Sequence, residues 1–216
     1  MKKNDFFYNN NLVNSNLSEL HKGMIYTECL KNKSKEELFA LGKKIVEEFA
    51  DVNNLLMPRI NKIGFNYRFP DNRGCYHLGE IEICMDNCSD PVKGEPVRRW
   101  TYPCYKADVT ALGVLAHEFG HHVAFKKNLR VPQIGSVSGY EPNHHEVSAE
   151  SLRLFILNPD LLRVIAPVRY RYLMGHLKPV VAQPWREVLQ GAGNRYFEVI
   201  EKFEKKLEKR FGGSKY

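Results

Sequence analysis

The stretch from Leu115 to His121 constrains this chain more than any other, because it places two histidines four residues apart with a glutamate directly after the first. Residues four apart share one face of an α-helix, so the imidazoles of His117 and His121 would lie one above the other. Two neutral imidazoles on one face can hold a zinc ion, and the Glu118 carboxylate beside them would reach a water on that ion. The stretch therefore predicts a helix that carries a metal site.

The residues around this stretch favour the same helix. Apolar side chains recur at helical spacing and predict a buried stripe on a different face from the histidines: Leu112, Leu115, Phe119 and Val123. Asp108 and Thr110 are both candidates for the N-cap. One side of the helix is thus expected to face the core while another carries the chemistry.

The remaining pattern indicates a small α+β domain. Ser34 followed by acidic residues predicts a helix over 35–56. Two β-type runs, Ile63 to Phe69 and Tyr76 to Met85, flank turn residues and predict an antiparallel hairpin. Residues 86–103, with three prolines and a glycine, predict an irregular loop. A second helix is expected over 144–157, ending at Asn158-Pro159.

Charge and periodicity divide the chain into three parts: a flexible N-terminal arm (1–33), the α+β domain (34–160) and a basic helical extension (161–216). Residues 160–216 contain twelve Lys/Arg and six Asp/Glu, which accounts for most of the net charge of +7. Helices are expected over about 160–177, interrupted at Pro167, over 185–189 as a short turn, and over 196–211. The positive charge suits nucleic acid or an acidic partner, although no aromatic-basic recognition motif accompanies it.

Two histidines cannot complete a catalytic zinc site, which usually has three protein ligands and an open position for water. A metzincin would continue with glycine and histidine where this chain has Ala124 and Lys127, so that class is excluded. Four downstream residues are candidates for the third ligand: His144, His145, Glu146 and Glu150. The two glutamates are four residues apart and share a face of the predicted second helix.

The segment from His145 to Glu150 resembles the second motif of the thermolysin-type gluzincins, a class of zinc metallopeptidases. The longer run from Glu146 to Pro159 is still more similar to the ImmA/IrrE-type intracellular metallopeptidases of bacteria and phages. Those proteins also place a Gly-x-Ile-x-Ile strand, here Gly79 to Ile83, ahead of the His-Glu-x-x-His helix. The resemblance covers roughly residues 35–160, with Glu150 and Leu152 standing where that pattern has Asn and Phe.

The resemblance implies a role for each matching residue. His117, His121 and Glu146 would bind one zinc ion. Glu118 would take a proton from the attacking water and later deliver it to the leaving amine. Glu150 would accept a hydrogen bond from a ligand imidazole and fix its tautomer.

Two further parts of such a site stay open at this point. An oxyanion-stabilising group is needed, and Tyr140, His144 and His145 are all candidates. The strand Glu80–Met85, placed at the sheet edge, could pair with an extended peptide substrate through its backbone.

The resulting hypothesis is a zinc metallopeptidase that hydrolyses an intracellular protein, from a bacterium, prophage or phage. One alternative is a catalytically weak or inactive metal-binding domain that docks to a partner or nucleic acid through its basic C-terminal helices. Another is a protease tethered to nucleic-acid-bound proteins by the same helices. No apolar run approaches the roughly 20 residues of a membrane span, and the cytoplasm is expected because no secretory signal is recognisable.

Overall fold

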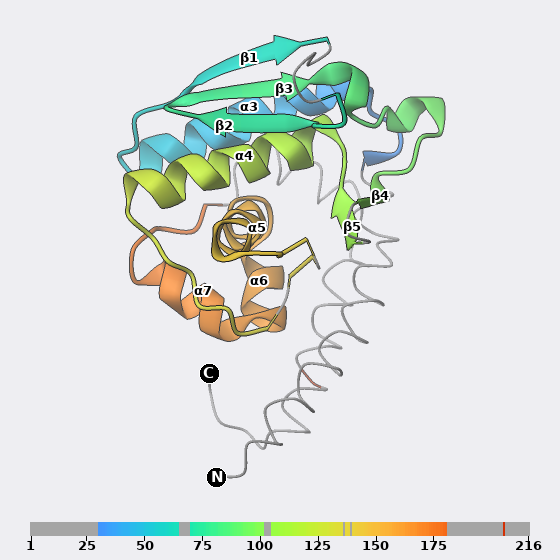
Figure 1. The fold of residues 1–216 in the computed structure, drawn as a ribbon. Coiled ribbons are helices and arrows are strands. Elements are labelled where there is room, and N and C mark those ends of the chain that lie inside the picture. Colours follow the sequence, from blue (N-terminus) through green and yellow to red (C-terminus); the bar gives the residue numbers. More distant parts are fainter. Residues whose placement is uncertain are drawn as a thin grey trace.

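Helices and a small sheet stack in layers around one central helix (Figure 1). The computed structural model describes residues 30–64, 70–101, 105–135, 137–138, 140–180 and 205. The helices in these ranges are α3 (Lys35–Val52), α4 (Ala111–Lys126), α5 (His144–Leu157), α6 (Pro159–Ile165) and α7 (Pro167–Met174). The strands are β1 (Arg59–Ile63), β2 (Gly74–His77), β3 (Glu80–Cys84), β4 (Arg98–Thr101) and β5 (Tyr105–Asp108), with 3₁₀ turns at Met85–Asn87 and Pro91–Lys93. The expected mixed α+β architecture is confirmed.

The first described helix begins where its sequence predicts. The Ser34 side chain accepts a hydrogen bond from the Glu37 backbone, and the Glu37 carboxylate accepts one from the Ser34 backbone at 2.7 Å. This reciprocal pair is a capping box. The helix ends at Val52 instead of the predicted Leu56, because Asn54 adopts a left-handed conformation with φ of 50°.

The sheet differs from the predicted hairpin. Its strand order is β1-β3-β2, with β1 parallel to β3 and β2 antiparallel to it. The hairpin lies within the second predicted run, where Leu78 and Gly79 have φ of 47° and 91° and form the turn. The prediction was wrong because a leucine at positive φ gives no turn signal in the sequence. Residues 65–69 of the first run lie outside the described ranges.

This order also corrects the strand expected at the edge. The predicted edge segment Glu80–Met85 contains β3, which lies between β1 and β2 and has both sides paired. The strand nearest α4 is β2, at one end of the sheet (Figure 1). The predicted loop 86–103 was also partly wrong, because β4 lies within it and pairs with β5 from Arg98↔Asp108 to Thr101↔Tyr105. Two four-residue strands are too short to show a clear alternation.

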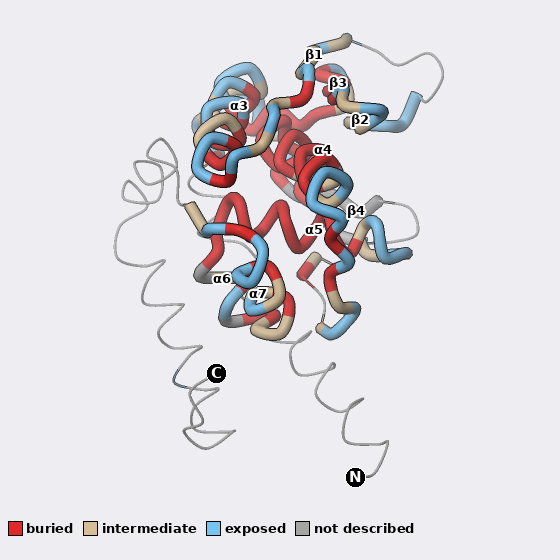
Figure 2. Tube along the Cα trace, turned by 90° about the vertical axis from the view of Figure 1, so that its left-hand side faces the viewer, coloured by how far each residue is buried: buried red, intermediate tan, exposed pale blue. Residues whose placement is uncertain are grey.

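The core forms where α3 and α5 pack against α4. The Phe49 ring of α3 makes edge-to-face contacts with Phe119 at 6.4 Å and Phe155 at 6.2 Å between centroids. The whole stretch Val147–Leu157 of α5 is buried, and Figure 2 shows most of α4 buried as well. The core continues past residue 160, since Leu162 and Leu173 belong to it.

Helices α6 and α7 replace the single interrupted helix expected over 160–177. Pro159 and Pro167 each stand in the first turn, where a missing backbone N–H costs nothing. None of the helices in the described ranges is long and apolar enough to cross a membrane. The N-terminal arm up to residue 29 and the helices expected over 185–189 and 196–211 lie outside those ranges.

Candidate metal centre

The helix that carries the two histidines is fixed at its start by a pair of polar residues. The Thr110 hydroxyl accepts a hydrogen bond from the Gly113 backbone at 3.2 Å, so Thr110 is the N-cap. Asp108, the other candidate, accepts hydrogen bonds from the Thr110 backbone and hydroxyl at 2.9 and 2.8 Å. Asp108 therefore positions Thr110, and Thr110 in turn caps the first turn of α4.

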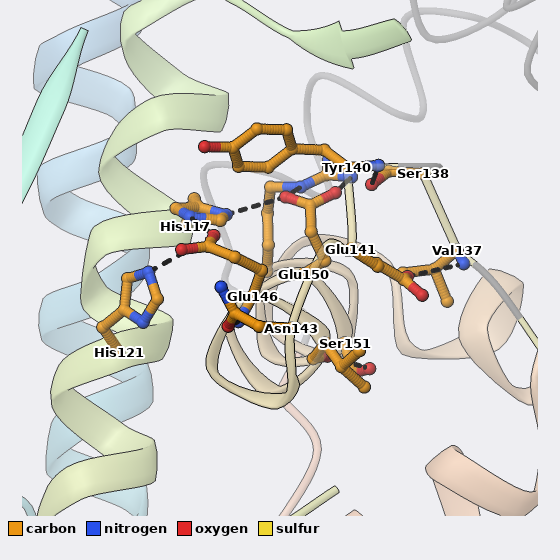
Figure 3. Close-up of polar contacts among 12 residues, drawn as sticks. His117, His121, Val137, Ser138, Tyr140, Glu141, Asn143, Glu146, Glu150 and Ser151 are labelled. Carbon is orange, nitrogen blue, oxygen red and sulfur yellow. Dashed lines mark hydrogen bonds and ion pairs between the residues drawn. The ribbon is translucent and has the colours of Figure 1, made fainter. Parts of the chain in front are cut away.

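Helix α5 brings a carboxylate to the two imidazoles (Figure 3). The Glu146 Oε2 atom lies 3.0 Å from Nε2 of His117 and 3.6 Å from Nε2 of His121. One ligand atom from each of the three residues lies within 4.8 Å of the other two. Asn143 starts α5 by accepting hydrogen bonds from the backbones of His145 and Glu146 at 2.9 and 3.1 Å, which puts Glu146 in the first turn.

These distances fit a metal ion. Ligand atoms at zinc distances in a tetrahedral site are about 3.3 Å apart, and the two measured separations lie on either side of that value. Glu146 Oε2 is shielded from water and has no hydrogen-bond donor of good geometry among the described residues. The three side chains remain 13–20% exposed, which leaves room for a water or substrate atom. Two histidines and a carboxylate form a donor set that suits zinc.

The protonation of His117 gives a second reason for a cation here. Its Nδ1 lies 2.8 Å from Glu150 Oε1, so a neutral imidazole would carry its proton there and present a lone pair to Glu146. Burial alone lowers the pKa of His117, but the contacts with Glu146 and Glu150 outweigh burial and raise it to about 10. The same histidine contacts hold the pKa of Glu146, despite its burial, down at about 2. A positive charge between these groups, either a proton or a metal ion, is therefore strongly favoured.

A buried arginine completes the support of His117. Burial alone would raise the pKa of Glu150, but the charges of Arg153 and His117 lower it below its ordinary value. The Arg153 guanidinium donates to both Glu150 oxygens at 2.9 Å. Glu150 thus lies where a residue that orients a ligand imidazole would lie, and Arg153 fixes its carboxylate plane.

Glu118 lies on the same helix, beside the ligand cluster and under strand β2. It is 8% exposed, and this burial, together with the Glu146 charge, raises its pKa against the lowering effect of the two histidines. A Cβ atom on Gly74 would lie 2.8 Å from the Glu118 Cγ and 2.7 Å from the Val114 Cγ1. Only glycine at this position in β2 leaves room for the Glu118 side chain.

The three candidates for oxyanion stabilisation lie in different places. The Tyr140 ring lies across the site, with its centroid 5.9 Å from that of His117 (Figure 3). Burial and the nearby carboxylates, Glu146 first, raise the pKa of Tyr140, so its hydroxyl keeps its proton. The side chains of His144 and His145 are exposed and lie against each other at 3.9 Å between centroids. The structure brings only Tyr140 of the three against the histidine pair.

Sequence reasoning missed several residues that shape this site. Gly74 and Gly120 are among them because each packs closely against another element, and Arg153 is among them because it fixes Glu150 on its own helix. For Arg153, the spacing of three residues after Glu150 on one helix was a usable signal. The two glycines had none, because close packing of backbones is visible only in three dimensions.

No protein-family model, curated protein or solved structure matches this chain.

Proposed function

We propose that this chain is a zinc-dependent metallopeptidase of the gluzincin type, similar to the ImmA/IrrE-like enzymes. The observation that carries the proposal is a buried glutamate, Glu118, on α4 next to three residues that could hold a metal ion, His117 and His121 of α4 and Glu146 of α5. A structural zinc site normally fills its fourth position with a protein ligand, whereas the partial exposure of His117, His121 and Glu146 leaves one open. Zinc is proposed because His117, Glu118 and His121 form the His-Glu-x-x-His pattern of zinc-dependent peptidases, and two histidines with a carboxylate are ligands that such sites use.

A zinc ion at this cluster would supply Lewis acidity and lower the pKa of water toward 7. Glu118 then acts as the general base that removes a proton from the attacking water and passes it to the leaving amine. Its raised pKa brings the carboxyl closer to neutral pH and so makes both transfers easier. Tyr140 is the proposed donor to the oxygen that gains charge, since it keeps its proton and lies against His117.

The substrate is proposed to bind as an added strand along β2. Cys84 donates its backbone N–H to the Arg73 carbonyl at 2.8 Å, so Arg73 and Cys84 are a hydrogen-bonded pair of the antiparallel β2–β3 ladder. Because hydrogen-bonded pairs alternate along such a ladder, the next one is Cys75 with Glu82. The backbone groups of Gly74 and Tyr76 therefore point away from β3, toward the side on which Glu118 lies. An extended peptide that paired there would pass its carbonyl groups over the metal centre.

The test is hydrolysis of a labelled unfolded protein by the full chain loaded with zinc. Glu118→Gln should retain stoichiometric zinc and lose at least about 100-fold in kcat, because it removes the base and leaves the ligands. Glu36→Gln, an exposed change in the first turn of α3, is the matched control and should leave kcat unchanged. Equal hydrolysis by Glu118→Gln and wild type would refute the proposed base, and wild-type protein without stoichiometric metal would refute the site.

The docking alternative concerns the basic C-terminal helices, of which the structure describes Lys205 alone beyond residue 180. It stays a prediction, as do the cytoplasmic location and a nucleic-acid partner. Salt-sensitive DNA binding that disappears when residues 181–216 are removed would favour it.

A further inference from the structure

One charged side chain, Arg169 of α7, is buried outside the metal centre without a role in the proposed chemistry. It is 1% exposed, and its two terminal nitrogens Nη1 and Nη2 donate to the Glu141 carboxylate at 2.9 and 2.8 Å. Burying an ion pair costs desolvation energy that a well-packed apolar pair would not, so its presence calls for a specific reason.

All five N–H groups of this guanidinium have acceptors. Besides the two bonds to Glu141, Nε donates to the Ile134 carbonyl at 3.1 Å, one Nη to the Gly135 carbonyl, and the other to the Ser151 hydroxyl at 3.1 Å. A lysine offers three donors on one atom and cannot reproduce this fork. The contacts join α7, α5 and the segment that precedes α5.

The residues held in this way lie on both sides of Tyr140 in the sequence. Arg169 binds Ile134 and Gly135 before it and Glu141 after it. The Glu141 carboxylate also accepts the Val137 backbone N–H at 2.9 Å, which ties Val137 to the same ion pair. Tyr140 is the residue next to Glu141, so this ion pair holds the backbone directly after the tyrosine.

We infer that Arg169 is a positioning residue, which holds Tyr140 across the metal centre through its buried pair with Glu141. Arg169 itself touches neither a ligand nor Glu118 through any hydrogen bond described above. Its effect on the reaction therefore passes through the placement of the Tyr140 hydroxyl. This inference rests on the proposed function for its kinetic consequences, but the placement itself is a structural statement that can be tested without activity.

The first experiment measures where Tyr140 lies. The full chain is labelled with 3-fluorotyrosine and loaded with Co²⁺, and the Tyr140 resonance is assigned by its loss in Tyr140→Phe. In wild type this ¹⁹F signal should show a paramagnetic shift, because the ring lies against His117. Arg169→Lys should change that shift while Co²⁺ binding stays stoichiometric. Arg171→Lys, an exposed change on the same helix, should not. An unchanged Tyr140 shift in Arg169→Lys overturns the inference.

The second experiment is a double-mutant cycle on peptide hydrolysis. Arg169→Lys should lower kcat by about tenfold or more with little change in KM, because a small displacement of a catalytic donor is costly. In the Tyr140→Phe background the same change should have almost no further effect. Equal losses in both backgrounds would mean that Arg169 acts only on stability, which overturns the inference.

A second variant covers the case in which Arg169→Lys does not fold. Glu141→Gln leaves the carbonyl contacts of Arg169 in place and should shift the Tyr140 signal in the same way. If wild type binds Co²⁺ but hydrolyses no peptide, the proposed function fails. The ¹⁹F comparison still decides the positioning role.

Discussion

Replacement of Gly120 by alanine tests whether the contact between α4 and α5 sets the geometry of the metal centre. Gly120 lies between the two histidines in the sequence, at a close contact of α4 with α5. A Cβ atom there would lie 2.7 Å from the Ala149 carbonyl oxygen and 3.1 Å from the Ala149 Cα. Both are backbone atoms, so neither can rotate away as the end of a side chain could.

The structure gives the size of the expected effect. An ordinary contact begins at 3.4 Å, so α5 must withdraw by about 0.7 Å at Ala149. Overpacking of this kind destabilises the folded state by about 1–3 kcal/mol, and the higher helix propensity of alanine offsets about 1 kcal/mol of that loss. Glu146 lies one turn from Ala149 on the same helix and would withdraw with it. The contacts at 3.0 and 3.6 Å would then lengthen beyond the spacing that a zinc ion bridges.

We therefore expect Gly120→Ala to weaken zinc binding by about 10–100-fold, the range seen when the support of a metal ligand is disturbed. Competition with a chromogenic chelator measures this affinity. Gly42→Ala is the matched control, because it adds the same atom to a helix packed on α4 but meets the movable side-chain ends of Leu112 and Leu115 at 3.3 Å. Wild-type zinc affinity in a folded Gly120→Ala protein would refute the reasoning.

Three further predictions concern the surroundings of the cluster. Gly74→Ala should lower kcat at least about tenfold with full zinc content, because the new atom displaces Glu118 and touches no ligand; hydrolysis beside metal analysis checks this. Arg153→Met should weaken zinc binding about 10–100-fold, since it frees Glu150 from its orientation, and chelator competition measures it. Because the pKa of His117 is raised to about 10 without metal, that residue is protonated at pH 7, and zinc binding should release about one proton and tighten as pH rises toward 9. Calorimetry in two buffers of different ionisation enthalpy counts that proton, and an equal heat in both would contradict the assignment.

The helices and the candidate ligands were the predictable part of this protein. The apolar stripe along α4 and the cap at Ser34 are local signals, set within one or two turns of chain. The shared face of Glu146 and Glu150 is likewise fixed by helical spacing alone. Helical spacing left His144, His145, Glu146 and Glu150 open as the third ligand, and the resemblance to the ImmA/IrrE-type enzymes singled out Glu146.

The sheet and the supporting contacts were not predictable in the same way. The order β1-β3-β2 depends on pairing between strands of four or five residues, whose patterns allow several registers. The turn at Leu78 is set by the pairing around it, against the intrinsic preference of leucine. Arg169 and Glu141 are 28 residues apart, and nothing in either segment marks them as partners. Such contacts form only when distant parts of the chain pack together, so no local sequence pattern predicts them.

The parts of the proposed site differ in what holds them. The proposed ligands lie on α4 and α5, whose buried faces form part of the core, so the packing of the core holds Glu146 and the two histidines in place. Tyr140 lies on a segment without regular structure, where backbone packing cannot fix a side chain. The buried Arg169 guanidinium binds the backbone carbonyl of Ile134 and the carboxylate of Glu141, the residue after Tyr140. These side-chain hydrogen bonds hold the backbone near Tyr140, which no helix or strand does. Burying this ion pair costs desolvation energy, and the pair lies beside Tyr140, the proposed catalytic group that a regular element does not hold.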